Sequence, residues 1–170
     1  MKFILVFLGT GTSQGVPVIG CSCVVCKSNN QKDNRLRTSA LIKTSACNIL
    51  IDIGPDFRYQ MLNSKNNNIS SILLTHQHRD HTAGLDDIRP IYYFNKLPID
   101  LYAEDCVSNA IKSDFRYLFD GPDYPGKPNI NIKTINNQPF LISSIQIIPI
   151  RAMHYKLPVF GYRIFDLAYI

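Results

Sequence analysis

The sequence has no long apolar run and little charge. Of its 170 residues, 45% are hydrophobic and 18% are charged, and the longest apolar run near the start, residues 3–8, has six residues. A membrane helix needs about 20 apolar residues, and the core of a signal peptide at least about 7. We therefore expect a globular cytoplasmic protein with no membrane span and no export signal.

A concentrated block of positive charge is also missing. Eighteen Lys and Arg against thirteen Asp and Glu give a net charge of +5, but the basic residues are scattered along the chain. Scattered charge favours anionic ligands only weakly, whereas proteins that grip nucleic acid gather basic residues into a patch or an arm. This distribution argues against nucleic acid as the partner.

The five cysteines do not form the even set of a disulfide framework. Cys21, Cys23 and Cys26 lie within six residues, too close together to cross-link a fold. Their spacing, Cys-x-Cys-x-x-Cys, offers three soft ligands for a structural zinc if a fourth ligand joins them, and the local sequence contains none. The alternative is a set of buried or free thiols. A reducing compartment and metal ligation fit these residues better than disulfides do.

Apolar runs broken by Gly, Pro and Asn predict a chain rich in strands. Strands are expected at residues 2–8, 39–44, 48–53, 69–75, 99–103, 130–135, 145–150 and 159–165, helices at 56–63 and 104–118, and loops at 9–34 and 120–129. The second and third strands have the pattern of a hairpin. No repeat or linker divides the chain, so residues 1–170 are expected to form one domain. Strands with interspersed helices predict an α/β or α+β sandwich.

Four metal-ligand side chains are crowded directly after the strand expected at 69–75, in the segment Thr75-His76-Gln77-His78-Arg79-Asp80-His81. Neutral imidazoles together with a carboxylate suit Zn, Mn or Fe. An extended two-residue step puts His76 and His78 on one side, and a turn at Arg79 brings Asp80 and His81 round toward a second ion. The spacing therefore predicts two divalent metal ions.

The chain has four histidines, and only His154 lies outside this cluster. Taken alone, it would be interpreted as a surface or core histidine. The dense cluster upstream reverses that preference, because His154 also follows a strand, the one expected at 145–150. We therefore expect it to be the third imidazole of the first metal.

These residues resemble the signature of the metallo-β-lactamase superfamily, His-x-His-x-Asp-His after a buried strand. The resemblance covers essentially the whole chain, because further segments follow in the order that the superfamily uses: residues 7–11 (FLGTG), 50–54 (LIDIG), Met153-His154 and 160–162 (FGY). The cysteine triplet, followed by Arg35, Thr38 and Ser39, is similar to the branch that contains the cyclic phosphodiesterase of the carbon–phosphorus lyase pathway.

The resemblance implies an αββα four-layer sandwich and a set of residue roles. His76, His78 and His154 would hold one ion and Asp80 with His81 the other, with Zn or Mn as the metals. A metal-bound hydroxide would be the nucleophile, and Asp80 would act as a catalytic residue that orients it. In the resembling branch a distant histidine completes the cysteine site, and no unassigned histidine remains in this chain.

Asp52 lies near the end of the strand expected at 48–53, and two interpretations stay open for it. It accepts a hydrogen bond from a ligating imidazole and so fixes its tautomer, or it forms the turn before Gly54.

Family members continue beyond the position of Ile170 with an acidic residue that bridges the two metals and with further histidines. The resemblance therefore implies that residues 1–170 are the N-terminal two-thirds of the domain, with its C-terminal part missing. We expect the first metal to bind more tightly than the second, and the uncovered apolar surface to favour association, for instance into a homodimer. This truncated piece is expected to be short of ligands for catalysis on its own.

The leading hypothesis is a dinuclear-metal hydrolase that cleaves a small or cyclic phosphodiester. A nuclease of the transfer-RNA processing branch shares the FLGTG start and the His cluster, but the cysteine triplet argues against it and no long basic arm is present. A third hypothesis is a non-catalytic carrier or binding protein with the same fold. Only the branch resemblance disfavours lactam or thioester hydrolysis.

Overall fold

Runs of Ile, Leu and Val build a six-stranded sheet in the computed structural model, which describes residues 2–120, 122 and 124–170. The strands lie in sequence order: β1 (Phe3–Gly9), β2 (Ser39–Thr44), β3 (Asn48–Ile51), β4 (Ser71–Leu73), β5 (Ile99–Glu104) and β6 (Ile130–Ile135). The first three are antiparallel neighbours, which confirms the predicted hairpin, and β3 to β6 are parallel. Parallel strands bring their carboxyl ends to one edge of the sheet, where loops collect functional residues.

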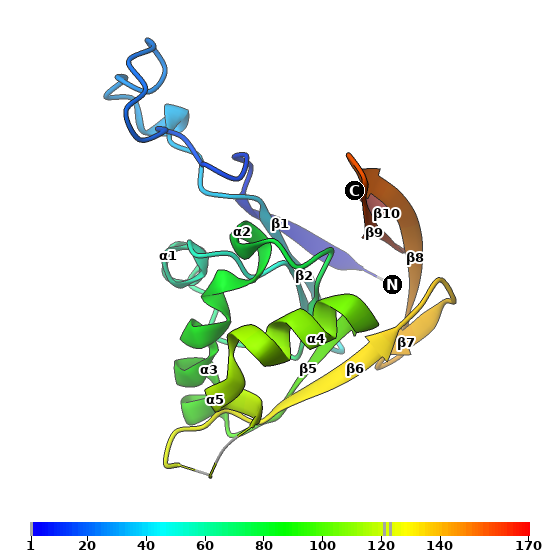
Figure 1. Ribbon diagram of the computed structural model, residues 1–170. Helices are drawn as coiled ribbons and strands as arrows, with labels where there is room; N and C mark the ends of the chain where they lie inside the picture. The colour runs from blue at the N-terminus through cyan, green and yellow to red at the C-terminus, as the bar shows by residue number, and fades with distance from the viewer. Residues whose placement is uncertain (1, 121, 123) are drawn as a thin grey trace.

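A second, four-stranded antiparallel sheet packs on the first. Its order is β10 (Leu167–Tyr169), β9 (Leu157–Ile164), β8 (Ile145–His154) and β7 (Phe140–Ile142). The helices α1 (Phe57–Ser64), α2 (Arg79–Thr82), η2 (Ala83–Ile88), α3 (Arg89–Asn95), α4 (Asp105–Asp114) and α5 (Arg116–Phe119) lie on the other face of the first sheet (Figure 1).

Two separate apolar cores hold these layers together. One lies between the helices and the first sheet and includes Phe57, Leu74 and Leu101. The other lies between the two sheets and includes Ile49 and Tyr162. A sheet that packs against an apolar core on each face needs apolar side chains on both faces, which is why β3 is a nearly continuous apolar run. Of the four expected layers, the described residues supply three: helices, sheet and sheet.

Several predicted elements differ from the structure. The helix expected at 104–118 is two helices, because Phe115 leaves helical geometry (φ −118°, ψ 43°) and buries its ring in the core. Strand β8 runs to His154 rather than ending at residue 150. Patterning did not predict α2, η2, α3, β7 or β10, whose length of at most seven residues gives little periodicity to detect. Of the loop expected at 120–129, Gly121 and Asp123 lie outside the described residues.

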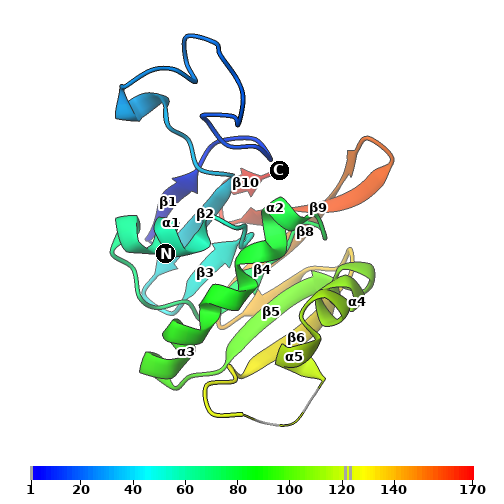
Figure 2. The same cartoon turned by 60° about the vertical axis from the view of Figure 1, so that its left-hand side comes forward.

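Residues 10–36 form an arm that projects from the body of the molecule (Figures 1 and 2). As expected for 9–34, regular structure is sparse in it and includes the short 3-10 helix η1 (Gln31–Asp33). The base of the arm is held by Arg37, whose guanidinium pairs with Asp56 at 2.9 Å. Among the described residues, no helix combines the length and the apolar character needed to cross a membrane.

Candidate metal centre

Strand β4 delivers His76 and His78 to the edge of the first sheet. The strand lies between β3 and β5, and Leu74 N donates to Tyr102 O at 3.0 Å, which carries the parallel pairing one residue further. The chain then turns into α2, with His78 in extended geometry as the residue before the helix. His76 is 6% exposed, whereas His78 is open to solvent. One imidazole is therefore anchored in the protein and the other faces outward.

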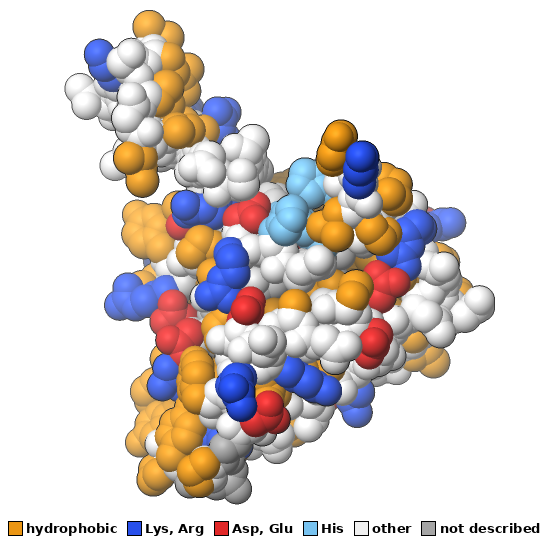
Figure 3. Space-filling view, in the orientation of Figure 1, with side chains coloured by type: hydrophobic (Ala, Val, Ile, Leu, Met, Phe, Trp, Pro, Cys, Tyr) orange, Lys and Arg blue, Asp and Glu red, His pale blue; other side chains and the backbone are white. Residues whose placement is uncertain are grey.

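His154 comes from the end of β8, in the second sheet, and meets these two imidazoles. One ring nitrogen from each of His76, His78 and His154 lies within 4.8 Å of the others. The ring centroids of His76 and His78 are 4.6 Å apart, and that of His154 lies 5.3 Å from His78. In the space-filling view the imidazoles reach the surface between the base of the arm and the end of the second sheet (Figure 3). The two sheets thus supply one three-imidazole group.

The protonation of His76 suits a metal ligand. The hydroxyl of Thr75 donates to the Asp52 carboxylate at 3.0 Å, so its oxygen is left to accept from His76 Nδ1, 2.9 Å away. This places the ring proton on Nδ1 and leaves the lone pair on Nε2, an atom that is buried and contacts no hydrogen-bonding group among the described residues. Burial and the neighbouring imidazoles of His81 and His78 lower the pKa of His76 to about 4. A neutral ring with an orphaned buried nitrogen fits a divalent metal ion.

Asp80 and His81 lie beside this group, on the first turn of α2. His81 Nε2 is 3.3 Å from Asp80 Oδ2, and its other ring nitrogen, Nδ1, is 2.6 Å from Asp52 Oδ2. Burial alone would lower the pKa of His81, but the hydrogen bond and charge of Asp52, with the charge of Asp80, raise it. Nε2 of His81 and the Asp80 carboxylate thus lie side by side, next to the three-imidazole group.

Asp52 is the buried centre of the hydrogen-bond network. It is 0% exposed, and its carboxylate accepts from Thr75 N at 2.9 Å, from the Thr75 hydroxyl and from His81. Its backbone has a left-handed φ of 59°, which Asp tolerates better than most residues. Of the two interpretations of Asp52, the structure shows the hydrogen-bond acceptor. Sequence reasoning missed Thr75 as a member of this network, although a hydroxyl directly before the His cluster is the signal that could have revealed it.

Gly54 lets the backbone approach the ligand segment closely. A Cβ at this position would lie 2.1 Å from Asp80 O, and Ile53 N donates to His81 O at 2.8 Å. The segment that follows β3 therefore packs main chain against main chain with the residues that carry the ligands. This contact requires glycine.

We expect Gly54→Ala to move α2 and to destabilise the protein by about 1–3 kcal/mol. The added methyl group would clash with the backbone oxygen of Asp80, and this oxygen cannot move without displacing its neighbours. Chemical denaturation and metal titration of the variant measure the two effects. Ser45→Ala, in the exposed β2–β3 turn, serves as control and should change neither. Wild-type stability and metal affinity in Gly54→Ala would contradict this prediction.

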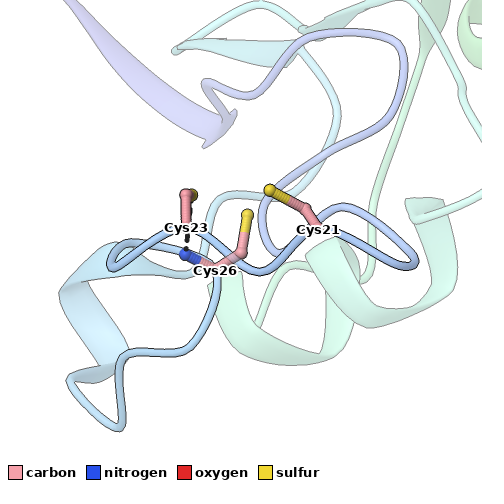
Figure 4. Close-up of side chains that lie close together, drawn as sticks. All are labelled: Cys21, Cys23 and Cys26. Carbon is pink, nitrogen blue, oxygen red and sulfur yellow. Dashed lines mark hydrogen bonds between the residues drawn. The ribbon is translucent and has the colours of Figure 1, made fainter.

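The three cysteines of the arm gather into a second group, separate from the imidazoles. The sulfur atoms of Cys21, Cys23 and Cys26 lie within 4.8 Å of one another (Figure 4). The Cys26 N–H donates to Cys23 Sγ at 3.4 Å, and this bond, with those from the other two thiols, lowers the pKa of Cys23 to about 7. Thiolate is the ligating form, so the triplet could hold a metal. Within the part of the chain that the structure describes, the group contains these three ligands and no fourth.

A small cavity of about 130 Å³ adjoins the imidazoles. Its walls come from both sheets and include Asp52, His76, His154, Phe160 and Tyr169. The hydroxyl of Tyr169 contacts Thr38 Oγ1 at 3.3 Å, so the last strand reaches the residue that precedes β2. The site therefore lies where the two sheets meet, and both sheets line it.

Two stacked sheets, helices on the outer face and an imidazole–carboxylate cluster at one edge define a mixed α/β protein of the metallo-β-lactamase fold. The chain belongs to the β-lactamase superfamily, because the model of the family described as "Beta-lactamase superfamily domain" matches residues 47–170.

The chain is also similar to three named proteins, two of which have solved structures. A diphosphatase from the PhnP family has a solved structure with 33% sequence identity and a TM-score of 0.90, over 99% of this chain and 65% of that one. Zn²⁺-bound PqqB from Methylobacterium extorquens shares the fold, with 22% identity and a TM-score of 0.71 over 96% of this chain and 61% of that one. An octanoyltransferase of Porphyromonas gingivalis is 42% identical over 167 residues, 97% of this chain. This chain spans 34% of that protein.

Proposed function

We propose that the chain carries the metal site of a hydrolase that cleaves a small or cyclic phosphodiester, with Zn or Mn as the ions. The observation that carries this proposal is the convergence of three imidazoles from two different sheets, with ring nitrogens within 4.8 Å. The orphaned Nε2 of His76 supports it, because a buried nitrogen without a partner is costly unless something binds it. Membership of the β-lactamase superfamily supports metal-dependent hydrolysis in general.

The proposed roles of the site residues follow from their positions. His76, His78 and His154 would hold one ion, and Asp80 with His81 a second. Bound divalent ions there would lower the pKa of a water and polarise a phosphoryl oxygen. Asp52 contacts the Nδ1 of His81, and Thr75 contacts the Nδ1 of His76, so the Nε2 of each ring is held in a fixed direction. Asp80, which is partly exposed beside His81, would orient the attacking water.

Phosphorus chemistry is favoured over acyl chemistry by similarity rather than by the site. Both proteins match nearly all of this chain, but the chain spans 65% of the diphosphatase and only 34% of the octanoyltransferase. The same ions would also activate attack on a carbonyl carbon, so acyl substrates belong in the test. A non-catalytic binding protein is the second candidate. The proposed site of the second metal ion favours this candidate, because the described residues supply only two ligands to it, Asp80 and His81.

Hydrolysis of bis(p-nitrophenyl) phosphate with added Zn²⁺ or Mn²⁺ tests the proposal, with p-nitrophenyl octanoate and a chromogenic β-lactam as competing substrates. The assay is run with and without a supplied C-terminal segment. We expect metal-dependent release of p-nitrophenol from the phosphodiester when that segment is present, its loss with chelator, and its loss in Asp80→Asn, whereas residues 1–170 alone should release little. Metal analysis should give one tightly held equivalent at the imidazoles and a weaker second. Metal binding without turnover of any substrate would support the binding protein. Turnover of the ester alone would contradict phosphodiester hydrolysis and indicate an acyl hydrolase.

A further inference from the structure

We propose that Arg151 is a positioning residue for the metal centre: its pairing with Glu104 fixes the end of β8 against the first sheet and so sets the position of His154. The inference rests on the proposed function only in taking His154 as a metal ligand, and it does not depend on the substrate. It concerns a basic residue on the strand that carries the lone ligand from the second sheet.

The end of β8 needs a contact that fixes it in place, because its last residues extend beyond the core between the sheets. Ile145, Ile147 and Pro149 are buried, but Arg151 and His154 are exposed. Strand residues rise about 3.3 Å each, so His154 stands about 10 Å beyond Arg151. The buried side chains of β8 itself therefore end before the residues that place the imidazole.

Arg151 connects this part of β8 to the first sheet through a bidentate ion pair with Glu104. Its Nη1 lies 2.9 Å from Glu104 Oε2 and its Nη2 lies 2.5 Å from Glu104 Oε1, and Nη2 also donates to Asn137 Oδ1 at 3.2 Å. Glu104 is the last residue of β5, so the pair joins the two sheets. The two side chains are 32% and 25% exposed, which leaves the pair partly shielded from water. A fork of this kind fixes orientation as well as distance.

The same guanidinium connects to His76 through Phe160. Its Cζ lies 3.9 Å from the centre of the Phe160 ring, which is 1% exposed, and Arg151 and Phe160 are direct partners in the β8–β9 ladder. Phe160 N donates to Thr75 O at 3.0 Å, next to His76. One continuous set of contacts thus ties the strand of His154 to the residue before His76.

The existing contacts assign Arg151 to positioning rather than to substrate binding. Both Nη atoms are engaged by Glu104, and one of them also contacts Asn137. A guanidinium whose fork is already filled by a carboxylate is not free to bind a phosphate in the same way.

The test compares Arg151→Gln and Glu104→Gln with Arg163→Gln, a matched control because Arg163 is an exposed arginine on the neighbouring strand β9. Zn²⁺ affinity of the full chain is measured by competition with a chelator, and the visible spectrum of the Co²⁺-loaded protein reports on its ligands. We expect either variant of the pair to lower Zn²⁺ affinity roughly 10- to 100-fold, as loss of a ligand's support does, and to alter the Co²⁺ spectrum. Arg163→Gln should change neither.

Each substitution is repeated in a His154→Ala background, where it should have no further effect on Zn²⁺ affinity, because the ligand that Arg151 positions is gone. The exchanged pair, Arg151→Glu with Glu104→Arg, should recover part of the affinity. An equal loss in both backgrounds, or a lower melting temperature with unchanged Zn²⁺ affinity and Co²⁺ spectrum in Arg151→Gln and Glu104→Gln, would overturn the inference. Failure of the wild-type chain to cleave phosphodiesters even when a C-terminal segment is supplied would overturn the proposed function and leave this inference intact.

Discussion

Replacement of His154 by alanine is expected to weaken binding of the first Zn²⁺ or Mn²⁺ ion by more than 100-fold. Loss of a group that merely supports a ligand already costs roughly 10- to 100-fold, and this change removes a ligand itself. His154 is exposed at the end of β8, so the metal-free protein should keep its stability within about 0.5 kcal/mol. Competition with a chelator and chemical denaturation in excess chelator measure the two quantities separately.

The matched control is Gln146→Ala, an exposed residue near the start of the same strand, which should change neither quantity. If His154→Ala bound Zn²⁺ as tightly as the wild type, the three-imidazole centre would be wrong, and with it the proposed hydrolase. A loss of stability equal in Gln146→Ala and His154→Ala would indicate damage to β8 rather than loss of a ligand.

Replacement of Asp52 by alanine is expected to destabilise the metal-free protein by about 3–5 kcal/mol, the usual cost of breaking a buried ion pair. The carboxylate is 0% exposed and accepts from Thr75 N, from the Thr75 hydroxyl and from His81. Alanine would leave these donors buried without partners. Domains have only about 5–15 kcal/mol of stability in total, so Asp52→Ala should lower the denaturant midpoint strongly.

Asp52→Asn is the matched variant for this prediction. Asn keeps one acceptor oxygen and tolerates the left-handed backbone at this position (φ 59°), so it should lose less stability than alanine. Because Asp52 raises the pKa of His81 above its ordinary 6.5, the stabilising ion pair is fully present below pH 6.5 and weakens as the pH rises through the raised value. The gap between wild type and Asp52→Asn should therefore narrow at alkaline pH. A stable Asp52→Ala protein would contradict the network described here.

Much of the first sheet could be predicted from local pattern, and the reason is chemical. Residues 39–44 and 48–53 are apolar runs broken by a short polar turn, and such runs have few other ways to bury their side chains. Residues 79–95 were not predicted as helical because each segment is at most seven residues long, too short for a helical period to stand out. The helix expected at 104–118 was too long because the burial of Phe115, which breaks it, depends on the core beneath.

The sequence alone determined the type of chemistry, since four ligands within six positions after a buried strand have few uses other than metal binding. Only the tertiary structure decided which atoms meet. His154 lies 73 positions or more from the other three histidines, and the stacking of one sheet on the other brings it to them. The same holds for the contact of Asp52 with His81 and for the pairing of Arg151 with Glu104. Local pattern constrains a strand and its ends, whereas the distance between side chains on different sheets is set by how the layers pack, which no single segment encodes.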